Sequence, residues 1–434
     1  MLFLMTRSED EMMPRIDQAG FASIADGVAG ASATGKVDPV ATGILSASAV
    51  SMPLFVVASG KRELRLDLFR GLALWMIYID HVSPDHLTWL TIRNYGFSDA
   101  AELFIFISGF TAALVYGRAT FESGFVIGTA RVLRRIWQIY TAHLLLFLVL
   151  MAEIACVVAV SNKPSFYIHE MEVADFFGDP GAVMIPTLLL RFRPLNMDVL
   201  PLYIVLMAFL PLVFLLARLH RDLPLAASIL FYILTIRYDL HLSTYRDGFW
   251  SFNPCAWQLL FVFGAWCALG GGRRLIAILD TRLTFWLAVA YLCAALFVTF
   301  TWHFPRLEGF IPAWLSRVIY PINKTDFDIL RLAHFLALTV VVLRFVRNDW
   351  AGLKSPFARP LILCGQYSLQ IFALGVALSF AGYALLMELD AGAALHFIVG
   401  VAGLLVMYCV AQTFTWYKWA TVGSESAPML SRTL

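Results

Sequence analysis

The stretch from Leu64 to His81, LRLDLFRGLALWMIYIDH, combines a membrane-length apolar run with charged side chains. A helix needs about 20 mainly apolar residues to cross the hydrocarbon core of a bilayer. Arg70 and His81 are eleven residues apart, and eleven steps of about 100° come to roughly 20° past three full turns. We therefore expect both side chains on one helix face, about 16 Å apart along the axis. Ionisable residues inside an apolar span usually mark a ligand or proton path.

The composition of the whole chain is that of a membrane protein. Of its 434 residues, 60% are hydrophobic and only 14% are charged, and the mean hydropathy is +0.75. A soluble domain of this size needs more polar surface to face water. The formal net charge of +2 argues against a nucleic-acid partner, which requires a clustered basic excess. The six cysteines are dispersed through apolar stretches, so we expect neither a metal site nor a disulfide framework.

Apolar runs predict an all-α polytopic membrane protein, a bundle of about ten transmembrane helices. The predicted spans are 64–82, 100–117, 136–160, 198–217, 223–237, 251–269, 283–302, 327–346, 361–387 and 395–417. Short loops rich in Lys and Arg are cytoplasmic. Such residues precede the first span and follow each even-numbered one: Lys61, Arg62, Arg65, Arg118, Arg131, Arg134, Arg135, Arg218, Arg221, Arg273, Arg274, Arg282, Arg344, Arg347, Lys354, Arg359 and Lys418. Both termini are therefore predicted to be cytoplasmic.

Three domains follow from this pattern. Residues 1–59 are rich in Ala, Ser and Gly and have no amphipathic period, which predicts a disordered cytoplasmic N-terminal tail. Residues 60–420 form the transmembrane domain, and 421–434 a short cytoplasmic C-terminal tail. Within the domain, residues 160–197 form the longest extracytoplasmic loop, whose Pro180-Gly181 turn and short apolar run indicate a re-entrant or interfacial element.

The first span carries further polar groups beside Arg70 and His81. Asp67 lies three residues before Arg70, so the two can pair along one face, either as an anchoring ion pair or as part of a binding site. Gly71 allows another backbone or a ligand to approach closely. Asp80 points about 100° away from its neighbour His81, so we expect it to face the extracytoplasmic vestibule.

The second span opens with Asp99-x-x-Glu102, which has two interpretations. An acid at the N-cap followed by an acid three residues later is the pattern of a capping box. Alternatively, Glu102 accepts a hydrogen bond from His81 and makes that imidazole a stronger base. Ser108-Gly109 is a small-residue notch typical of close helix packing.

Polar residues also gather at the start of the eighth span. They are Asn323, Lys324, Asp328, Arg331 and His334. They either bind a substrate carboxylate or form a buried network whose members satisfy one another, and we favour the first. Gln258 in the sixth span and Gln366 in the ninth are further candidates, although hydrogen bonding between helices is the simpler explanation for such amides. Gln366 and Gln370 are predicted to share a helix face.

Four strings carry a resemblance to a known family: LDLFRGLALWMIYIDH, RNYGFSDAAELFIFISGFTAALVYG, NKTDFDILRLAHFLAL and CGQYSLQIF. The chain resembles the OpgC family of membrane succinyltransferases from about Leu64 to about Trp419. That family is similar to the wider acyltransferase-3 superfamily, whose first helix carries an Arg-x10-His motif, and Arg70 and His81 match its spacing. The resemblance implies a bacterial inner-membrane enzyme that succinylates periplasmic glucans. Acyl-CoA, here succinyl-CoA, is implied as a co-substrate on the cytoplasmic side, with no permanently bound cofactor.

The resemblance and the residues together suggest roles. Arg70 would clamp the donor phosphates, because a guanidinium is always charged and binds two oxygens at once, with Asp67 beside it in the donor-binding site. The pantetheine arm would thread through a pore to His81, which would act as general base or accept the acyl group itself, with Asp99 and Glu102 beside it. Lys324 or Arg331 would bind the free succinyl carboxylate. Asp80, Asn323, Asp328, His334, Gln258 and Gln366 would line the substrate path. The alternatives are a glycan transporter or flippase without acyl chemistry, and a structural or sensor protein.

Overall fold

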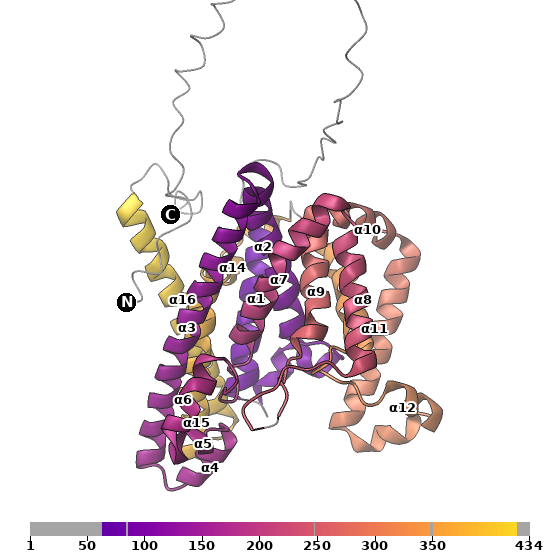
Figure 1. The fold of residues 1–434 in the computed structure, drawn as a ribbon. Helices are drawn as coiled ribbons and strands as arrows, with labels where there is room; N and C mark the ends of the chain where they lie inside the picture. The colour runs from indigo at the N-terminus through magenta and orange to yellow at the C-terminus, as the bar shows by residue number, and fades with distance from the viewer. Residues whose placement is uncertain (1–62, 84–85, 247, 348–349, 423–434) are drawn as a thin grey trace, which may run out of the picture. The chain divides into compact units, whose positions relative to one another are not determined.

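The computed structural model describes residues 63–83, 86–246, 248–347 and 350–422. These residues fold into helices (Figure 1), most of them joined by short connections, with a longer one at residues 239–253 between α8 and α9. The helices that follow the predicted spans are α1 (Leu64–Val82), α2 (Ala100–Glu122), α3 (Phe125–Val160), α7 (Val199–Leu219), α8 (Leu223–Tyr238), α9 (Pro254–Trp266), α11 (Arg282–His303), α13 (Ile329–Phe345), α14 (Ala358–Gln366), α15 (Ser368–Glu388) and α16 (Ala393–Val422). Shorter elements are η4 (Leu87–Leu90), η5 (Ile92–Tyr95), α4 (Pro164–Glu170), α5 (Ala174–Gly178), α6 (Pro180–Leu188), η6 (Cys267–Gly271), α10 (Gly272–Leu279), η7 (Pro305–Phe310), α12 (Ala313–Ile319) and η8 (Ala351–Lys354).

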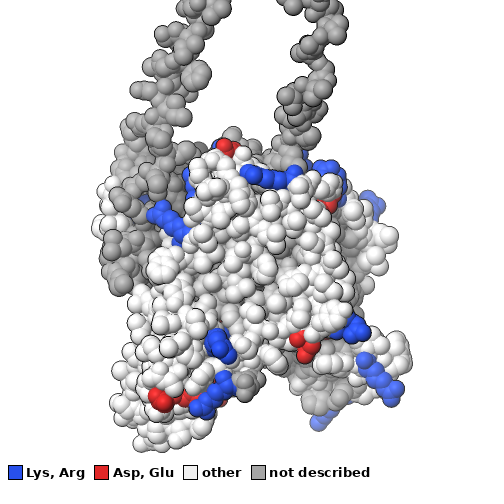
Figure 2. All heavy atoms as spheres, in the orientation of Figure 1, with Lys and Arg blue, Asp and Glu red and all other residues white. Residues whose placement is uncertain are grey.

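The all-α polytopic membrane fold is confirmed. Within the described residues, seven helices are long and apolar enough to cross a membrane: Ala100–Glu122, Phe125–Val160, Val199–Leu219, Pro254–Leu279, Arg282–His303, Ser368–Glu388 and Ala393–Thr421. The other three predicted spans fold as α1, which carries several charged side chains, and as α8 and α13, which are only 16 and 17 residues long. Figure 2 shows a broad face almost free of charged side chains between Lys, Arg, Asp and Glu at its two ends.

Three helices differ from the predicted spans. The third begins at Phe125, so Arg131, Arg134 and Arg135, predicted to lie in a loop, belong to the first turns of α3. The predicted ninth span is interrupted at Tyr367, whose φ of −109° and ψ of 40° end α14 before α15 begins. Gln366 and Gln370 therefore lie on different helices, and the prediction that they share a face is wrong. The sixth span ends in a π-helical turn in which Gly270 has a φ of 106°, a left-handed conformation that glycine adopts without steric cost.

The predicted extracytoplasmic loop at 160–197 is largely helical, since it contains α4, α5 and α6. The predicted N-terminal tail, 1–59, lies outside the described residues, as do residues 423–434 of the predicted C-terminal tail. Their predicted disorder stays a prediction.

Glycines set the two closest helix crossings near the first two spans. α1 packs against α14 and α15, and α2 packs against α9. A Cβ atom added to Gly71 would meet the backbone carbonyl of Leu361 in α14, and one added to Gly365 would meet the carbonyl of Asp67 in α1. At the α2–α9 crossing, Gly109 and Gly264 face each other's helix backbones in the same way. A backbone or a ligand was predicted to approach Gly71, and the structure shows a backbone there. The small-residue notch at Gly109 likewise allows α2 and α9 to pack closely.

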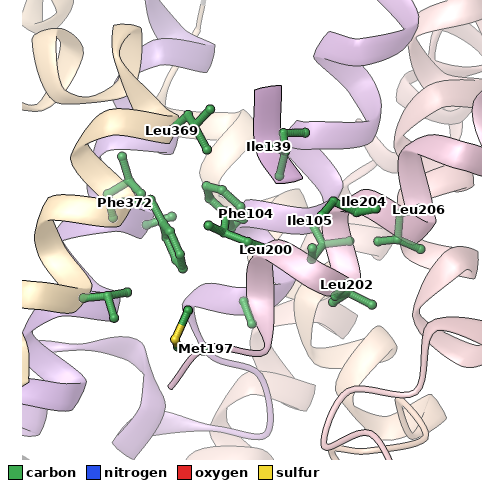
Figure 3. Packing of buried hydrophobic residues seen from close by; sticks show 14 of the residues in the cluster. Phe104, Ile105, Ile139, Met197, Leu200, Leu202, Ile204, Leu206, Leu369 and Phe372 are labelled. Carbon is green, nitrogen blue, oxygen red and sulfur yellow. The ribbon is translucent and has the colours of Figure 1, made fainter. Parts of the chain in front are cut away.

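Large apolar side chains fill the space between these helices. Figure 3 shows Phe104 of α2 facing Leu369 and Phe372 of α15, with Leu200 of α7 close by. The rings of Phe104 and Phe372 stack with their centroids 5.9 Å apart. α15 packs mainly against α1, α3 and α16, and its contact with α1 forms one wall of the cavity described next.

Candidate functional site

A small cavity lies beside His81, between α1 and α15. Its lining comprises Leu74, Ile77, Tyr78, His81, Ile371, Phe372, Gly375, Val376 and Ser379. The α1 members recur at helical spacing along one stripe, and Arg70 starts that stripe four residues before Leu74. The cavity volume of about 10 Å³ is room for about one water molecule. Apart from the His81 ring and two hydroxyl-bearing residues, the lining is apolar, so the imidazole has few competing polar neighbours there.

Arg70 occupies the other end of this stripe. Its Nη2 donates a hydrogen bond to Thr111 Oγ1 of α2 at 2.5 Å, and the Thr111 hydroxyl in turn donates to the carbonyl of Ile107 at 2.7 Å. Asp67, one turn earlier, is buried. The structure therefore keeps Arg70 half-buried between α1 and α2, away from the polar groups at the His81 end.

Two carboxylates and two cations meet where α2 and α13 begin. Lys324 Nζ lies 2.6 Å from Asp99 Oδ2, and Arg331 Nη2 lies 3.2 Å from the same oxygen. Arg331 also reaches Glu102 Oε1, with Nε at 2.7 Å and Nη2 at 2.6 Å. Glu102 is fully buried and the Arg331 side chain is 9% exposed. A charge buried to this degree is tolerated only when it is paired, and here the two negative charges match the two positive ones.

The electrostatics of Asp99 follow from this pairing. Burial disfavours its charged form, but the Lys324 ammonium and the Arg331 guanidinium outweigh that effect and hold the pKa of Asp99 well below its ordinary value. Asp99 is therefore ionised throughout the physiological pH range. Its other oxygen accepts the Ala101 backbone N–H at 2.8 Å, so the carboxylate is fixed in orientation.

The capping box predicted at Asp99-x-x-Glu102 is confirmed. The Asp99 side chain caps the first turn of α2, and Glu102 Oε2 accepts the Asp99 backbone N–H at 2.8 Å. The alternative, in which Glu102 holds the imidazole of His81, is wrong. Among the described residues, the hydrogen-bond donors to Glu102 are the Arg331 side chain of α13 and the Asp99 backbone N–H.

Trp257, the neighbour of Gln258, and Asn253 hold the loop that carries Lys324, a partner that the sequence did not predict for either residue. Trp257 Nε1 of α9 donates to the carbonyls of Lys324 at 3.1 Å and Thr325 at 3.2 Å. Asn253, the N-cap of α9, donates its backbone N–H to the Thr325 carbonyl at 3.0 Å and its Nδ2 to Asp326 Oδ1 at 2.9 Å. The only local signal was Asn253-Pro254, the usual start of a helix, which does not reveal a partner over seventy residues away.

The remaining residues of the eighth-span group have structural partners. Asn323 Nδ2 donates to Asp326 Oδ2 at 2.7 Å, and Asp328 caps α13 by accepting the Leu330 N–H at 2.8 Å. His334 is buried, and its Nδ1 lies 2.7 Å from Ser98 Oγ and accepts the Ser98 backbone N–H at 3.3 Å. The contact between His334 and Ser98 ties α13 to the chain segment that enters α2, whereas the contacts of Asn323 and Asp328 are local. Together these contacts support the buried-network interpretation for His334 and Asp328.

Asp80 and the two glutamines also have defined surroundings. Asp80 is buried and accepts a hydrogen bond from Thr91 Oγ1 at 2.7 Å. Gln258 is buried and exchanges hydrogen bonds with Ser228 of α8, accepting from its hydroxyl at 2.7 Å and donating to its carbonyl at 3.0 Å. This is the interhelical pairing that the sequence favoured. Gln366 is half-buried at the end of α14.

Most of the predicted site residues thus fall into two groups, one around His81 and one around Arg70. The charges of Lys324 and Asp99 act on both Asp80 and His81, so these four residues share one electrostatic environment. Along α1, Arg70 lies about three turns from His81 and Asp67 about four. Gln258 is engaged elsewhere, between α8 and α9. The arrangement places one imidazole beside a cavity, a cation near it, and a second cation at the far end of the same helix face.

Comparison with known proteins gives one family. The family model described as OpgC protein matches residues 62–419. No curated protein and no solved structure gives a significant match to the chain.

Proposed function

The chain belongs to the OpgC family, and we propose that it is a membrane O-acyltransferase of the bacterial inner membrane. In this proposal it moves a succinyl group from cytoplasmic acyl-CoA to a hydroxyl of a periplasmic glucan. Membership of the family supports glucan modification by a transferase. The proposed donor follows from the family resemblance, the direction across the membrane follows from the Lys and Arg bias of the loops, and the residue roles rest on the geometry of α1.

The observation that carries the proposal is the stripe on α1 that begins at Arg70 and ends at His81. Arg70 supplies a permanent positive charge suited to the donor phosphates. About 16 Å further along the axis, His81 faces a cavity. A donor bound by its phosphates at Arg70 would extend its thin pantetheine arm along this stripe towards His81. One face of α1 would therefore contact both the phosphates and the acyl end of the same donor molecule.

The proposed step transfers the acyl group from the thioester sulfur of the donor to a hydroxyl oxygen of the glucan. The His81 imidazole accepts the proton of the glucan hydroxyl, the hydroxyl oxygen bonds to the thioester carbonyl carbon, and the carbon–sulfur bond breaks. The thiolate then takes the proton from the imidazolium, so that coenzyme A leaves as the thiol. In a second version, the neutral His81 imidazole bonds to the acyl carbon first, the carbon–sulfur bond breaks and coenzyme A leaves as the thiolate. The glucan hydroxyl then takes the acyl group from the imidazole, and its proton passes to the thiolate. Both versions need the imidazole unprotonated at the start.

The size of the cavity adds a condition to this proposal. Room for about one water molecule does not hold a pantetheine arm, so donor binding requires α1 and α15 to separate along the stripe. Tyr78 Oη donates to the Val399 carbonyl of α16 at 3.1 Å, and this contact would be among those that change. Motion of this kind is common where loops or helices enclose a reaction.

The proposal is tested by mixing the purified full-length protein with labelled succinyl-CoA and a glucan acceptor. We expect label in the glucan and release of free coenzyme A in equal amounts. A glycan transporter or flippase would instead move glucan across proteoliposomes while leaving the thioester intact. That result would replace the transferase proposal.

A further inference from the structure

Lys324 and Arg331, the two cations of the cluster formed with Asp99 and Glu102, differ in exposure and in the number of carboxylates that they contact. Arg331 is 9% exposed and contacts both Asp99 and Glu102, whereas the Lys324 side chain is 44% exposed and has Asp99 as its carboxylate partner. An ammonium on a flexible stem can also turn to a new partner more easily than a guanidinium held by two carboxylates. Lys324 is therefore the cation of this cluster that a ligand from outside can reach.

The contacts of Asp99 make an exchange of partners inexpensive. Its Oδ2 atom accepts from both Lys324, at 2.6 Å, and Arg331, at 3.2 Å. If Lys324 turned towards an incoming anion, Asp99 would keep the Arg331 contact and its Ala101 cap. A buried carboxylate that lost its only cation would be strongly destabilising, and the second cation removes that obstacle.

The backbone beneath Lys324 is fixed while its side chain stays accessible. Trp257 and Asn253 hold the carbonyls of Lys324 and Thr325. The ammonium lies 5.0 Å from the ring centre of Phe252, a cation–π contact that does not consume a hydrogen-bond donor. The charge also acts on the His81 imidazole. A fixed backbone that carries an exposed ammonium is the arrangement expected of a residue that binds a ligand.

We propose that Lys324 binds the free carboxylate of a dicarboxylic acyl group while the carbonyl end of that group reacts at His81, with Asp99 as the counter-ion that Lys324 releases. This inference rests on the proposed function and deepens it, since it assigns donor specificity to one residue. The donor phosphates are a different anion, but they belong at Arg70, three turns away on α1. Arg331 stays with Glu102 and keeps the cluster folded.

The test compares two donors of nearly equal size, succinyl-CoA and its uncharged amide analogue succinamyl-CoA. Transfer of each to glucan is measured with the full-length wild-type protein and with Lys324→Gln. We expect the wild type to favour the charged donor, and Lys324→Gln to lose roughly tenfold to a hundredfold in succinyl transfer while transfer from the amide donor is largely retained. Lys324→Arg keeps the charge and should keep the preference for succinyl.

Lys163→Gln is the matched control, because Lys163 is exposed in the connection before α4 and should leave both donors unaffected. Equal losses for both donors in Lys324→Gln, or no loss for either, would overturn the inference. So would a wild type that does not distinguish the two donors, a result that does not depend on whether any variant folds. A wild type that transfers neither group would instead refute the proposed function.

Discussion

Arg331 of α13 and Glu102 of α2 form the most deeply buried charged contact of the cluster, and this predicts a non-additive effect on stability. Arg331→Met leaves Glu102 without its guanidinium and should cost about 3–5 kcal/mol. The double variant Arg331→Met with Glu102→Leu should be more stable than the sum of the two single changes implies. Thermal unfolding of the wild type, both single variants and the double variant in detergent measures this coupling. Single effects that add within about 0.5 kcal/mol would show that the contact contributes little.

The pairing of Asp99 with Lys324 and Arg331 predicts how the stability of the folded protein depends on pH. Because the pKa of Asp99 is lowered in the folded protein, its contribution is fully present above its unfolded pKa of about 3.9 and is lost as the pH falls through the lower folded value. The melting temperature of the wild type minus that of Asp99→Asn should therefore stay constant between about pH 5 and 8. It should shrink only in more acidic solution. A difference that already disappears between those two pH values would contradict the pairing with Lys324 and Arg331.

At this scale the sequence reveals local contacts and misses distant ones. The Asp99-x-x-Glu102 capping box spans one helical turn, so its spacing alone predicted it. The partner of Glu102 is 229 residues away, and no spacing rule connects positions so far apart. Trp257 lies in an apolar span without a visible partner in the sequence, yet its indole N–H donates to the Lys324 backbone carbonyl.

The crossing of α1 and α14 depends on glycine, and this predicts a sharp cost for adding a single methyl group. In Gly71→Ala the new Cβ would meet the Leu361 carbonyl, a backbone atom that cannot rotate away. We expect a loss of about 1–3 kcal/mol or more, measured as a lower melting temperature. Gly178→Ala is the control, since its Cβ would meet nothing within 4 Å beyond its chain neighbours and its own helix backbone. Equal melting temperatures for both variants would mean that α1 and α14 do not pack this closely.

Helices were predictable as elements, while their interruptions were not. Hydropathy placed a helix at each of the ten predicted spans because burial in lipid needs long apolar runs. The break at Tyr367 falls within the polar string Gln366-Tyr367-Ser368, and the left-handed Gly270 begins a run of three glycines before Arg273. Such residues permit a break, but a hydropathy pattern does not fix the residue at which a helix ends. The start of α3 at Phe125 was missed because its first turns carry several arginines, which were interpreted as part of a cytoplasmic loop.

The whole chain makes one prediction about orientation. The bias of Lys and Arg alternates from loop to loop, which places both termini in the cytoplasm. A reporter fused after Ser165, at the start of α4, should then be extracytoplasmic, and one fused after Arg273, in α10, should be cytoplasmic. Reporters that give the opposite pattern would reverse the proposed direction of acyl transfer, because Arg70 would face the wrong compartment for acyl-CoA.

The central claim for the molecule is that one helix face divides donor binding and transfer between Arg70 and His81. The most direct test is a single-turnover measurement of acyl transfer together with acyl-CoA affinity in Arg70→Ala and His81→Ala, with His169→Ala, an exposed histidine of α4, as control. We predict that His81→Ala binds the donor nearly normally but loses a factor of about 10² to 10⁴ in transfer. Arg70→Ala should instead weaken donor binding by about 1.5–3 kcal/mol, and Arg70→Lys should restore only part of it. Full transfer by a folded His81→Ala protein would contradict the account.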